Sequence, residues 1–123
     1  MSASYVLATS ALQAFENNEP GADRVAAELG RGAVISAYDW YEVLAEWGQQ
    51  PPEALLVLAA CALYIVPFDE QDALEAARLC ASTGLSLGVC ACLVTASSLG
   101  LPVLTADKAM AALDVGVIIV LIR

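Results

Sequence analysis

The chain has 123 residues, of which 59% are hydrophobic and 15% are charged. This length suits a single domain over residues 1–123, and the high apolar content excludes the weakly hydrophobic, highly charged class of disordered chains. A net charge of −9, from 14 acidic and five basic residues, repels nucleic acid at long range and favours a basic partner, although an acidic surface that only maintains solubility gives the same charge.

Apolar segments in the chain are too short for a bilayer. The longest run, over residues 54–66, falls short of the roughly 20 residues that a membrane-spanning helix needs. The N-terminus shows no basic region followed by a small-residue cleavage site, the pattern of a secretory signal. We therefore expect a cytoplasmic protein with no membrane partner.

The chain contains no histidine, and its four cysteines form no Cys-x-x-Cys pair. A zinc site would need such a pair or histidine ligands, and a nucleophilic serine would need a general base. Neither kind of site is therefore expected. The cysteines are predicted to be free and to pack as small buried apolar side chains; they are Cys61, Cys80, Cys90 and Cys92.

Short apolar strands alternate with helical patterns along the chain, which is typical of a parallel sheet with crossover helices. The last strand is apolar enough to be buried on both faces. The predicted elements, in chain order, are a strand over 5–7, helices to 15 and over 20–29, a strand over 33–35, helices over 37–47 and 53–62, a strand over 64–66, helices over 70–82 and 89–99, a strand over 103–104, a helix over 108–113 and a strand over 117–122.

Polar residues mark where several helices begin. Thr9 or Ser10 is predicted to cap the first helix, Ser36 the third and Asp69 the fifth.

Two helices also carry packing patterns. Aromatic and aliphatic residues recur at helical spacing after Ser36, at Trp40, Val43, Leu44 and Trp47. Small residues after Asp69 predict a close-packing face, formed by Ala73, Ala76, Ala77 and Cys80.

The order of these motifs resembles that of the PIN domain, and most closely the VapC-type toxins of bacterial toxin–antitoxin modules. The resemblance covers nearly the whole chain and implies a three-layer α/β/α sandwich around a parallel sheet of about five strands. It rests on the segments 5–12, 19–23, 35–37 with 42–44, 66–69, 84–88, 91–93 and 103–107.

The resemblance implies hydrolysis of an RNA phosphodiester by water held on Mg²⁺ or Mn²⁺. Hard divalent cations take oxygen ligands, so such a site needs clustered carboxylates. The family's four acidic positions fall on Ala8, Glu42, Val89 and Asp107. Because only Glu42 and Asp107 keep their acid, we expect weak or absent metal binding and little or no ribonuclease activity.

Other positions near the implied site carry weaker predictions. Asp39 lies one turn before Glu42, where the family more often has asparagine, and it could add charge to the metal site or be a solvated acid at the start of its helix. Glu42 and Asp107 have similar alternatives, as a helix-surface acid and a helix cap. The resemblance also implies possible substrate contacts from Thr9, Ser10 and Ser86, and it places Cys80 and Cys90 where relatives often carry arginine.

Two functions remain open on the sequence. The first is an impaired endoribonuclease toxin that keeps residual activity through Glu42, Asp39 and Asp107. RNA is a partner only if that activity is retained. The second is a PIN scaffold without catalysis, which acts through protein binding. Its expected partners are a second copy in a homodimer and a basic antitoxin-like protein.

Overall fold

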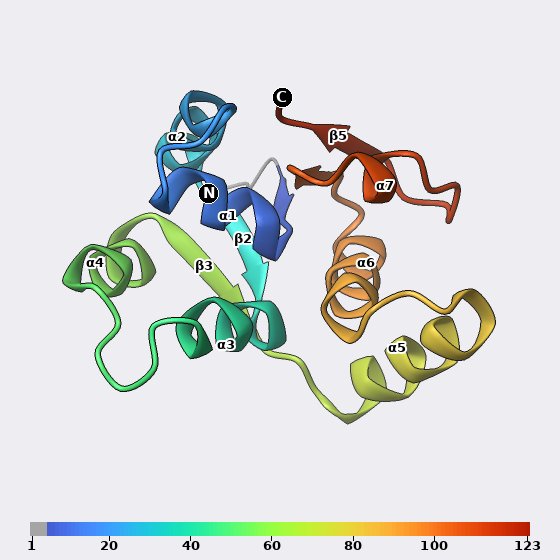
Figure 1. Cartoon of the computed structure of the whole chain (residues 1–123). Helices are drawn as coiled ribbons and strands as arrows, with labels where there is room; N and C mark the ends of the chain where they lie inside the picture. The colour runs from blue at the N-terminus through green and yellow to red at the C-terminus, as the bar shows by residue number, and fades with distance from the viewer. Residues whose placement is uncertain (1–4) are drawn as a thin grey trace.

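A computed structural model describes residues 5–123, whose five parallel strands form one sheet in the order β3-β2-β1-β4-β5 (Figure 1). The predicted five-stranded parallel sheet is therefore confirmed. The strands are β1 (Val6–Leu7), β2 (Ala33–Ser36), β3 (Leu63–Val66), β4 (Val103–Thr105) and β5 (Ile119–Leu121). The helices are α1 (Thr9–Glu16), α2 (Ala22–Arg31), α3 (Ala37–Ala45), α4 (Glu53–Cys61), α5 (Glu70–Thr83), α6 (Leu87–Leu99) and α7 (Lys108–Ala111).

Side chains of the central strands point alternately to the two faces of the sheet, so the hydrophobic core has one part on each face. Leu7 of β1 and Ile35 of β2 pack with α1, α2, α3 and α4 on one face. Val6 and Val34 point to the other face and pack with α6 and α7. Successive side chains of a strand point to opposite faces, so both faces of this sheet are apolar. The α/β/α layering follows, with α5 packed against α6 (Figure 1).

Two of the predicted helix caps are confirmed. Ser36 is the N-cap of α3, and its hydroxyl accepts a hydrogen bond from the Asp39 N–H at 2.9 Å. Asp69 is the N-cap of α5 and forms a capping box with Asp72. Both caps satisfy backbone donors that the first helical turn leaves free.

Several helix boundaries differ from the prediction by one or two residues. Helix α2 begins at Ala22 because the chain first passes through a left-handed conformation at Gly21, with φ of 96°. Helix α3 ends at Ala45, short of Gly48. Helix α6 begins at Leu87 rather than Val89, because the Ser86 hydroxyl accepts from the Val89 N–H and caps a longer helix.

Burial corrects several further expectations. The last strand was expected to be buried on both faces, but the residues of β5 are only half-buried because it is an edge strand. In α5 only Ala76 is buried, so the four-residue packing face is wrong at Ala73 and Ala77, which are exposed. All four cysteines are free, but Cys61 is exposed and Cys80 is partly exposed. Within residues 5–123 no helix is both long and apolar enough to cross a bilayer.

Candidate functional site

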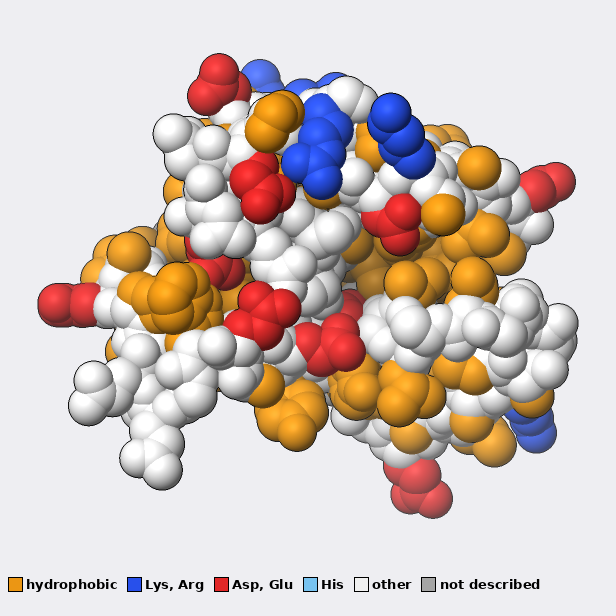
Figure 2. All heavy atoms as spheres, viewed as in Figure 1, with side chains coloured by type: hydrophobic (Ala, Val, Ile, Leu, Met, Phe, Trp, Pro, Cys, Tyr) orange, Lys and Arg blue, Asp and Glu red, His pale blue; other side chains and the backbone are white. Residues whose placement is uncertain are grey.

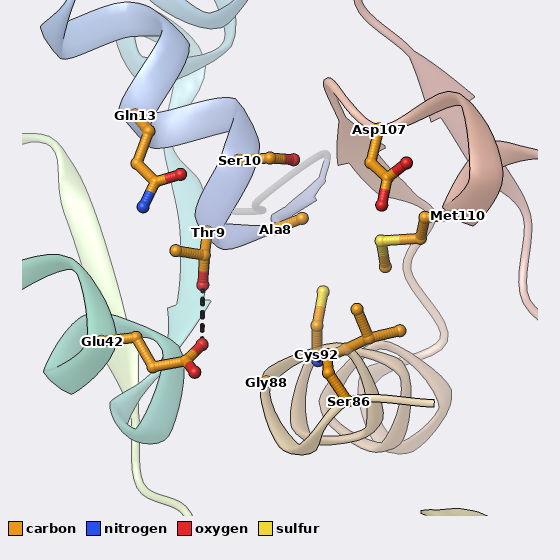
Figure 3. Close-up of a pocket in the computed structure, with 11 residues that line it drawn as sticks. Ala8, Thr9, Ser10, Gln13, Glu42, Ser86, Gly88, Cys92, Asp107 and Met110 are labelled. Atoms are coloured by element: carbon orange, nitrogen blue, oxygen red, sulfur yellow. Dashed lines mark hydrogen bonds between the residues drawn. The ribbon is translucent and has the colours of Figure 1, made fainter. Parts of the chain in front are cut away.

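A pocket of about 180 Å³ lies beyond the carboxyl ends of β1 and β4. The strand order reverses at these two strands, and open α/β sheets commonly place ligand sites at such a reversal. All the predicted site residues except Asp39 line this pocket, so one cavity collects side chains from α1, α3, α6 and the end of β4 (Figure 3). The lining residues are Ala8, Thr9, Ser10, Gln13, Glu42, Ser86, Gly88, Val89, Cys92, Asp107 and Met110.

Glu42 forms one wall of the pocket. Its carboxylate approaches the first turn of α6 at Gly88, where a Cβ would lie 2.0 Å from Glu42 Oε1. From the side of α1, the Thr9 hydroxyl donates a hydrogen bond to Glu42 Oε1 at 3.2 Å (Figure 3). The position of the Glu42 carboxylate at the end of its side chain is therefore determined by Gly88 of α6 and by the hydroxyl of Thr9.

Asp39 lies behind that wall and is fully buried. The Ser36 hydroxyl donates to its Oδ2 at 2.9 Å, and the Thr9 hydroxyl lies 3.3 Å from its Oδ1. Burial raises the pKa of Asp39 to about 7, with a further increase from the nearby Glu42 charge, while the bonds from Ser36 and Thr9 oppose the rise. The solvated alternative for Asp39 is therefore wrong, although its place in the first turn of α3 is as predicted.

Asp107 forms the opposite wall and also caps α7, because its Oδ1 accepts the Ala109 N–H at 2.9 Å. The segment before it is tied to α1. The Ser10 hydroxyl lies 3.1 Å from the Thr105 hydroxyl and accepts the Ala106 N–H at 3.0 Å. Ser10 thus holds the end of β4 and, through it, the position of Asp107.

The first helix begins at the pocket without the predicted side-chain cap. Its N-cap is Ala8, and no side chain there accepts a hydrogen bond. Thr9 and Ser10 are the first two residues of the helix instead, and their hydroxyls bond to α3 and to the end of β4. Since α6 also begins at the pocket, the positive ends of two helices face it and partly offset the charges of Glu42 and Asp107.

The floor between the two acids is apolar. Ala8, which is 4% exposed, and the half-buried Val89 contribute carbon atoms to it. Two sulfur-bearing side chains, Cys92 and Met110, complete it (Figure 3). Burial raises the pKa of the Cys92 thiol well above its usual range, so this group is neutral near pH 7.

Four lining residues were not predicted from the sequence, and helical spacing would have found three of them. Cys92 lies three residues after Val89, Met110 three after Asp107, and Gln13 four after Thr9. Residues three or four apart share one face of a helix, so each accompanies a predicted residue into the pocket. Gly88 is the fourth. Its role lies in the absence of a side chain, which leaves space for the Glu42 carboxylate.

The donor set does not fit a Mg²⁺ or Mn²⁺ site. These cations take about six oxygen ligands, several of them usually from clustered carboxylates. Only two carboxylates line the pocket, those of Glu42 and Asp107, and they lie on opposite walls (Figure 3). Over residues 5–123, no three or more acidic or thiol side chains are grouped so that they could hold a metal ion.

The comparisons with known proteins agree on the fold. A family model described as PIN domain matches residues 5–116. Among solved structures, a toxin–antitoxin complex from Klebsiella pneumoniae matches with a TM-score of 0.76 and 20% identity over 98% of both chains. DNA-bound VapBC from Salmonella typhimurium matches with a TM-score of 0.74 and 17% identity, over 99% of this chain and 100% of that one.

A third similar structure is PAE2754 from Pyrobaculum aerophilum. It has a TM-score of 0.69 and 20% identity, over 97% of this chain and 90% of the other. No curated protein sequence matches the chain.

Proposed function

The chain belongs to the PIN-domain family, and we propose that it is a VapC-like member of a toxin–antitoxin module whose ribonuclease site is inactive or strongly impaired. The family match and the two similar structures named as toxin–antitoxin or VapBC complexes support the first part. On this proposal the protein descends from Mg²⁺-dependent or Mn²⁺-dependent endoribonucleases. The proposed loss of activity is argued from the residues that line the pocket.

The observation that carries the proposal is the apolar floor between Glu42 and Asp107. Ala8 and Val89 line the pocket together with the two acids, so the apolar replacements lie in the cavity where the implied ligands would be needed. Neither side chain can coordinate a cation. Because even changes outside the ligand shell commonly reduce metal affinity or activity about 10–100-fold, the loss of two ligands should reduce them further.

Electrostatics around the pocket also disfavour RNA. Figure 2 shows acidic side chains near the middle of the viewed face, over α1 and α3, and basic side chains in its upper part and at its lower right. Arg31 and Arg123 are paired with Glu28 and Glu19, at 2.8 Å and 3.4 Å. A phosphate backbone would therefore meet a negative surface, which opposes binding unless cations neutralise it.

RNA cleavage tests this proposal most simply. The chain and an Ala8→Asp, Val89→Asp double variant are incubated with RNA in the presence of Mn²⁺, and a sample without metal serves as the control. We expect cleavage by the double variant and none by the unmodified chain. Metal-dependent cleavage by the unmodified chain would refute the impaired site, and a double variant that neither binds metal nor cleaves would refute the placement of the ligands.

The second candidate function, protein binding without catalysis, is favoured by exposed large apolar side chains on α4 and on the neighbouring edge strand β3, which together we call the edge face. Leu56 and Val57 of α4 are 50% and 52% exposed, and Tyr64 of the edge strand β3 is 62% exposed. Exposed large apolar groups that gather on one face mark interaction sites more often than isolated ones do. With a net charge of −9, we propose that this edge face binds a basic amphipathic segment of an antitoxin-like protein.

Binding of a basic amphipathic peptide can be measured by fluorescence anisotropy at low and high salt. We expect binding that weakens with salt and is lost in a Leu56→Asp, Val57→Asp variant. A Leu99→Asp variant, changed at an exposed leucine of α6, should bind normally. Equal loss in both variants, or no binding, would contradict the assignment of this face. A homodimer stays a prediction, and light scattering on the same variants shows whether a second copy uses the edge face instead.

A further inference from the structure

Two thiols lie at the contact between α5 and α6, outside the pocket. The Cys80 Sγ lies 3.9 Å from the carbonyl oxygen of Ser86, and the Cys90 Sγ lies 3.9 Å from the carbonyl oxygen of Leu85. The two sulfur atoms therefore contact consecutive carbonyl groups of one short connection. Cys80 also packs against the small apolar cluster that contains Cys90.

Small side chains bring the two helices together at this point. Ala76 and Cys80 are one turn apart on α5, and Cys90 and Val94 are one turn apart on α6; all four belong to this cluster or pack against it. Pairs four residues apart lie on one face of a helix, and small residues there allow close approach of the backbones. This geometry favours the short separation between cysteine backbones that a disulfide requires.

We propose that Cys80 and Cys90 are an oxidation site that forms a reversible disulfide between α5 and α6. Nothing in this proposal depends on nuclease activity. Cys80 is partly exposed and Cys90 is buried, so an oxidant in solution reaches Cys80 first. Such a division into an accessible thiol and an adjacent resolving thiol is the usual arrangement in redox-sensitive proteins.

With hydrogen peroxide as the oxidant, the Cys80 Sγ attacks one peroxide oxygen, the O–O bond breaks, and water leaves. The Cys90 Sγ then displaces the hydroxyl group of the Cys80 sulfenic acid as a second water molecule, and the S–S bond forms. Two thiol hydrogens and two electrons pass to the peroxide overall. Burial and the neighbouring Cys80 raise the pKa of Cys90 to about 12, so the second step should be slow near pH 7 and faster in alkaline solution.

The disulfide would close a loop that contains part of the pocket. Ser86, Gly88 and Val89 all lie between the two cysteines in sequence, and all three line the pocket. Oxidation would therefore fix the first turn of α6 relative to α5 and limit the movement of one pocket wall. The effect on folding follows from the loss of freedom in the unfolded chain.

The test uses the full chain with Cys61→Ser, because Cys61 is exposed and could form bonds between molecules. The protein is treated with hydrogen peroxide, its remaining thiols are alkylated after denaturation, and its intact mass is measured. We expect a species that is lighter by two hydrogen atoms before alkylation and takes up one alkyl group, at Cys92. A reductant should restore three reactive thiols.

Matched variants identify the pair. The change should disappear in Cys80→Ser and persist in Cys92→Ala, because the Cys92 thiol faces Leu7 of the sheet instead. Oxidation should also raise the melting temperature by roughly 5–10 °C, reversibly, only where both Cys80 and Cys90 are present. Full alkylation of all three thiols after peroxide treatment, or a disulfide that persists in Cys80→Ser, would overturn the proposal.

Discussion

The carboxylate of Glu42 occupies the space in which a side chain at Gly88 would begin. A Cβ added at Gly88 would lie 2.0 Å from Glu42 Oε1 and 2.8 Å from its Cδ. Helix α3 can therefore bring its acid against the first turn of α6 only because α6 has a glycine there. This relationship fixes one wall of the pocket and connects two helices that are far apart in the sequence.

Replacing Gly88 by alanine should move Glu42 without unfolding the protein. The added methyl group displaces the flexible end of Glu42 and breaks its bond from Thr9. The gain in helix propensity, about 1 kcal/mol, should offset much of that cost, so the free energy of unfolding should change by less than about 1 kcal/mol. In the Ala8→Asp, Val89→Asp background, Mn²⁺ affinity should fall about tenfold or more, as judged by calorimetry.

Gly30→Ala is the matched control for this change. Gly30 lies in α2 and has no heavy atom within 4 Å of an added Cβ. This substitution should raise the free energy of unfolding by about 0.5–1 kcal/mol and leave Mn²⁺ affinity unchanged. If Gly88→Ala behaved in the same way as Gly30→Ala, the close approach of Glu42 to α6 would be wrong.

Asp39 makes stability depend on pH. Its pKa in the folded protein, about 7, is raised from 3.8. Between these values the folded state binds more protons than the unfolded state, so the contribution of Asp39 to the free energy of unfolding falls as pH rises from about 4 to about 7. Asp39→Asn removes this loss. The stability of the variant relative to the unmodified chain should therefore rise over that interval by on the order of 4 kcal/mol and then stay constant.

Urea unfolding of both proteins at several pH values measures this difference. Asp114→Asn provides the control, because Asp114 is an exposed acid and its replacement should shift stability by less than about 0.5 kcal/mol at every pH. A pH-independent difference between Asp39→Asn and the unmodified chain would contradict the raised pKa of the buried acid.

Thr9 holds the two acids of α3 together. Its hydroxyl lies 3.2 Å from Glu42 Oε1 and 3.3 Å from Asp39 Oδ1. Thr9→Val keeps the shape but removes the donor, so it should lower the free energy of unfolding by about 1–2 kcal/mol near pH 8, where Asp39 is mostly ionised. Thr9→Ser keeps the hydroxyl and should recover most of that loss in thermal or urea unfolding. Equal stability of the valine and serine variants would show that the hydroxyl is not needed.

Much of the fold could be predicted from the sequence because its signals are local. The alternation of apolar strands with helices predicts a parallel sheet, and Ser36 and Asp69 mark helix starts that the structure confirms. Errors arose where a partner elsewhere in the chain decides the outcome. Thr9 matches a cap by composition, but its hydroxyl bonds to α3 instead. The last strand looks like a core strand, but its place at the sheet edge leaves it half-buried.

The candidate site was predictable in part, for a similar reason. The family resemblance groups Ala8, Glu42, Val89 and Asp107, and all four line one pocket. The burial of Asp39 and the role of Gly88 could not, since both depend on how α1, α3 and α6 pack in space. No sequence pattern distinguishes a buried acid in a first helical turn from a solvated one.

We propose that this PIN domain keeps the frame of a metal site without enough ligands. Calorimetric titration of Mn²⁺ into the unmodified chain and into the Ala8→Asp, Val89→Asp variant tests it most directly. On this proposal the double variant should bind Mn²⁺ at least about 100-fold more tightly, because its two added carboxylates lie with Glu42 and Asp107 around one cavity. Equally tight binding by both proteins would contradict it.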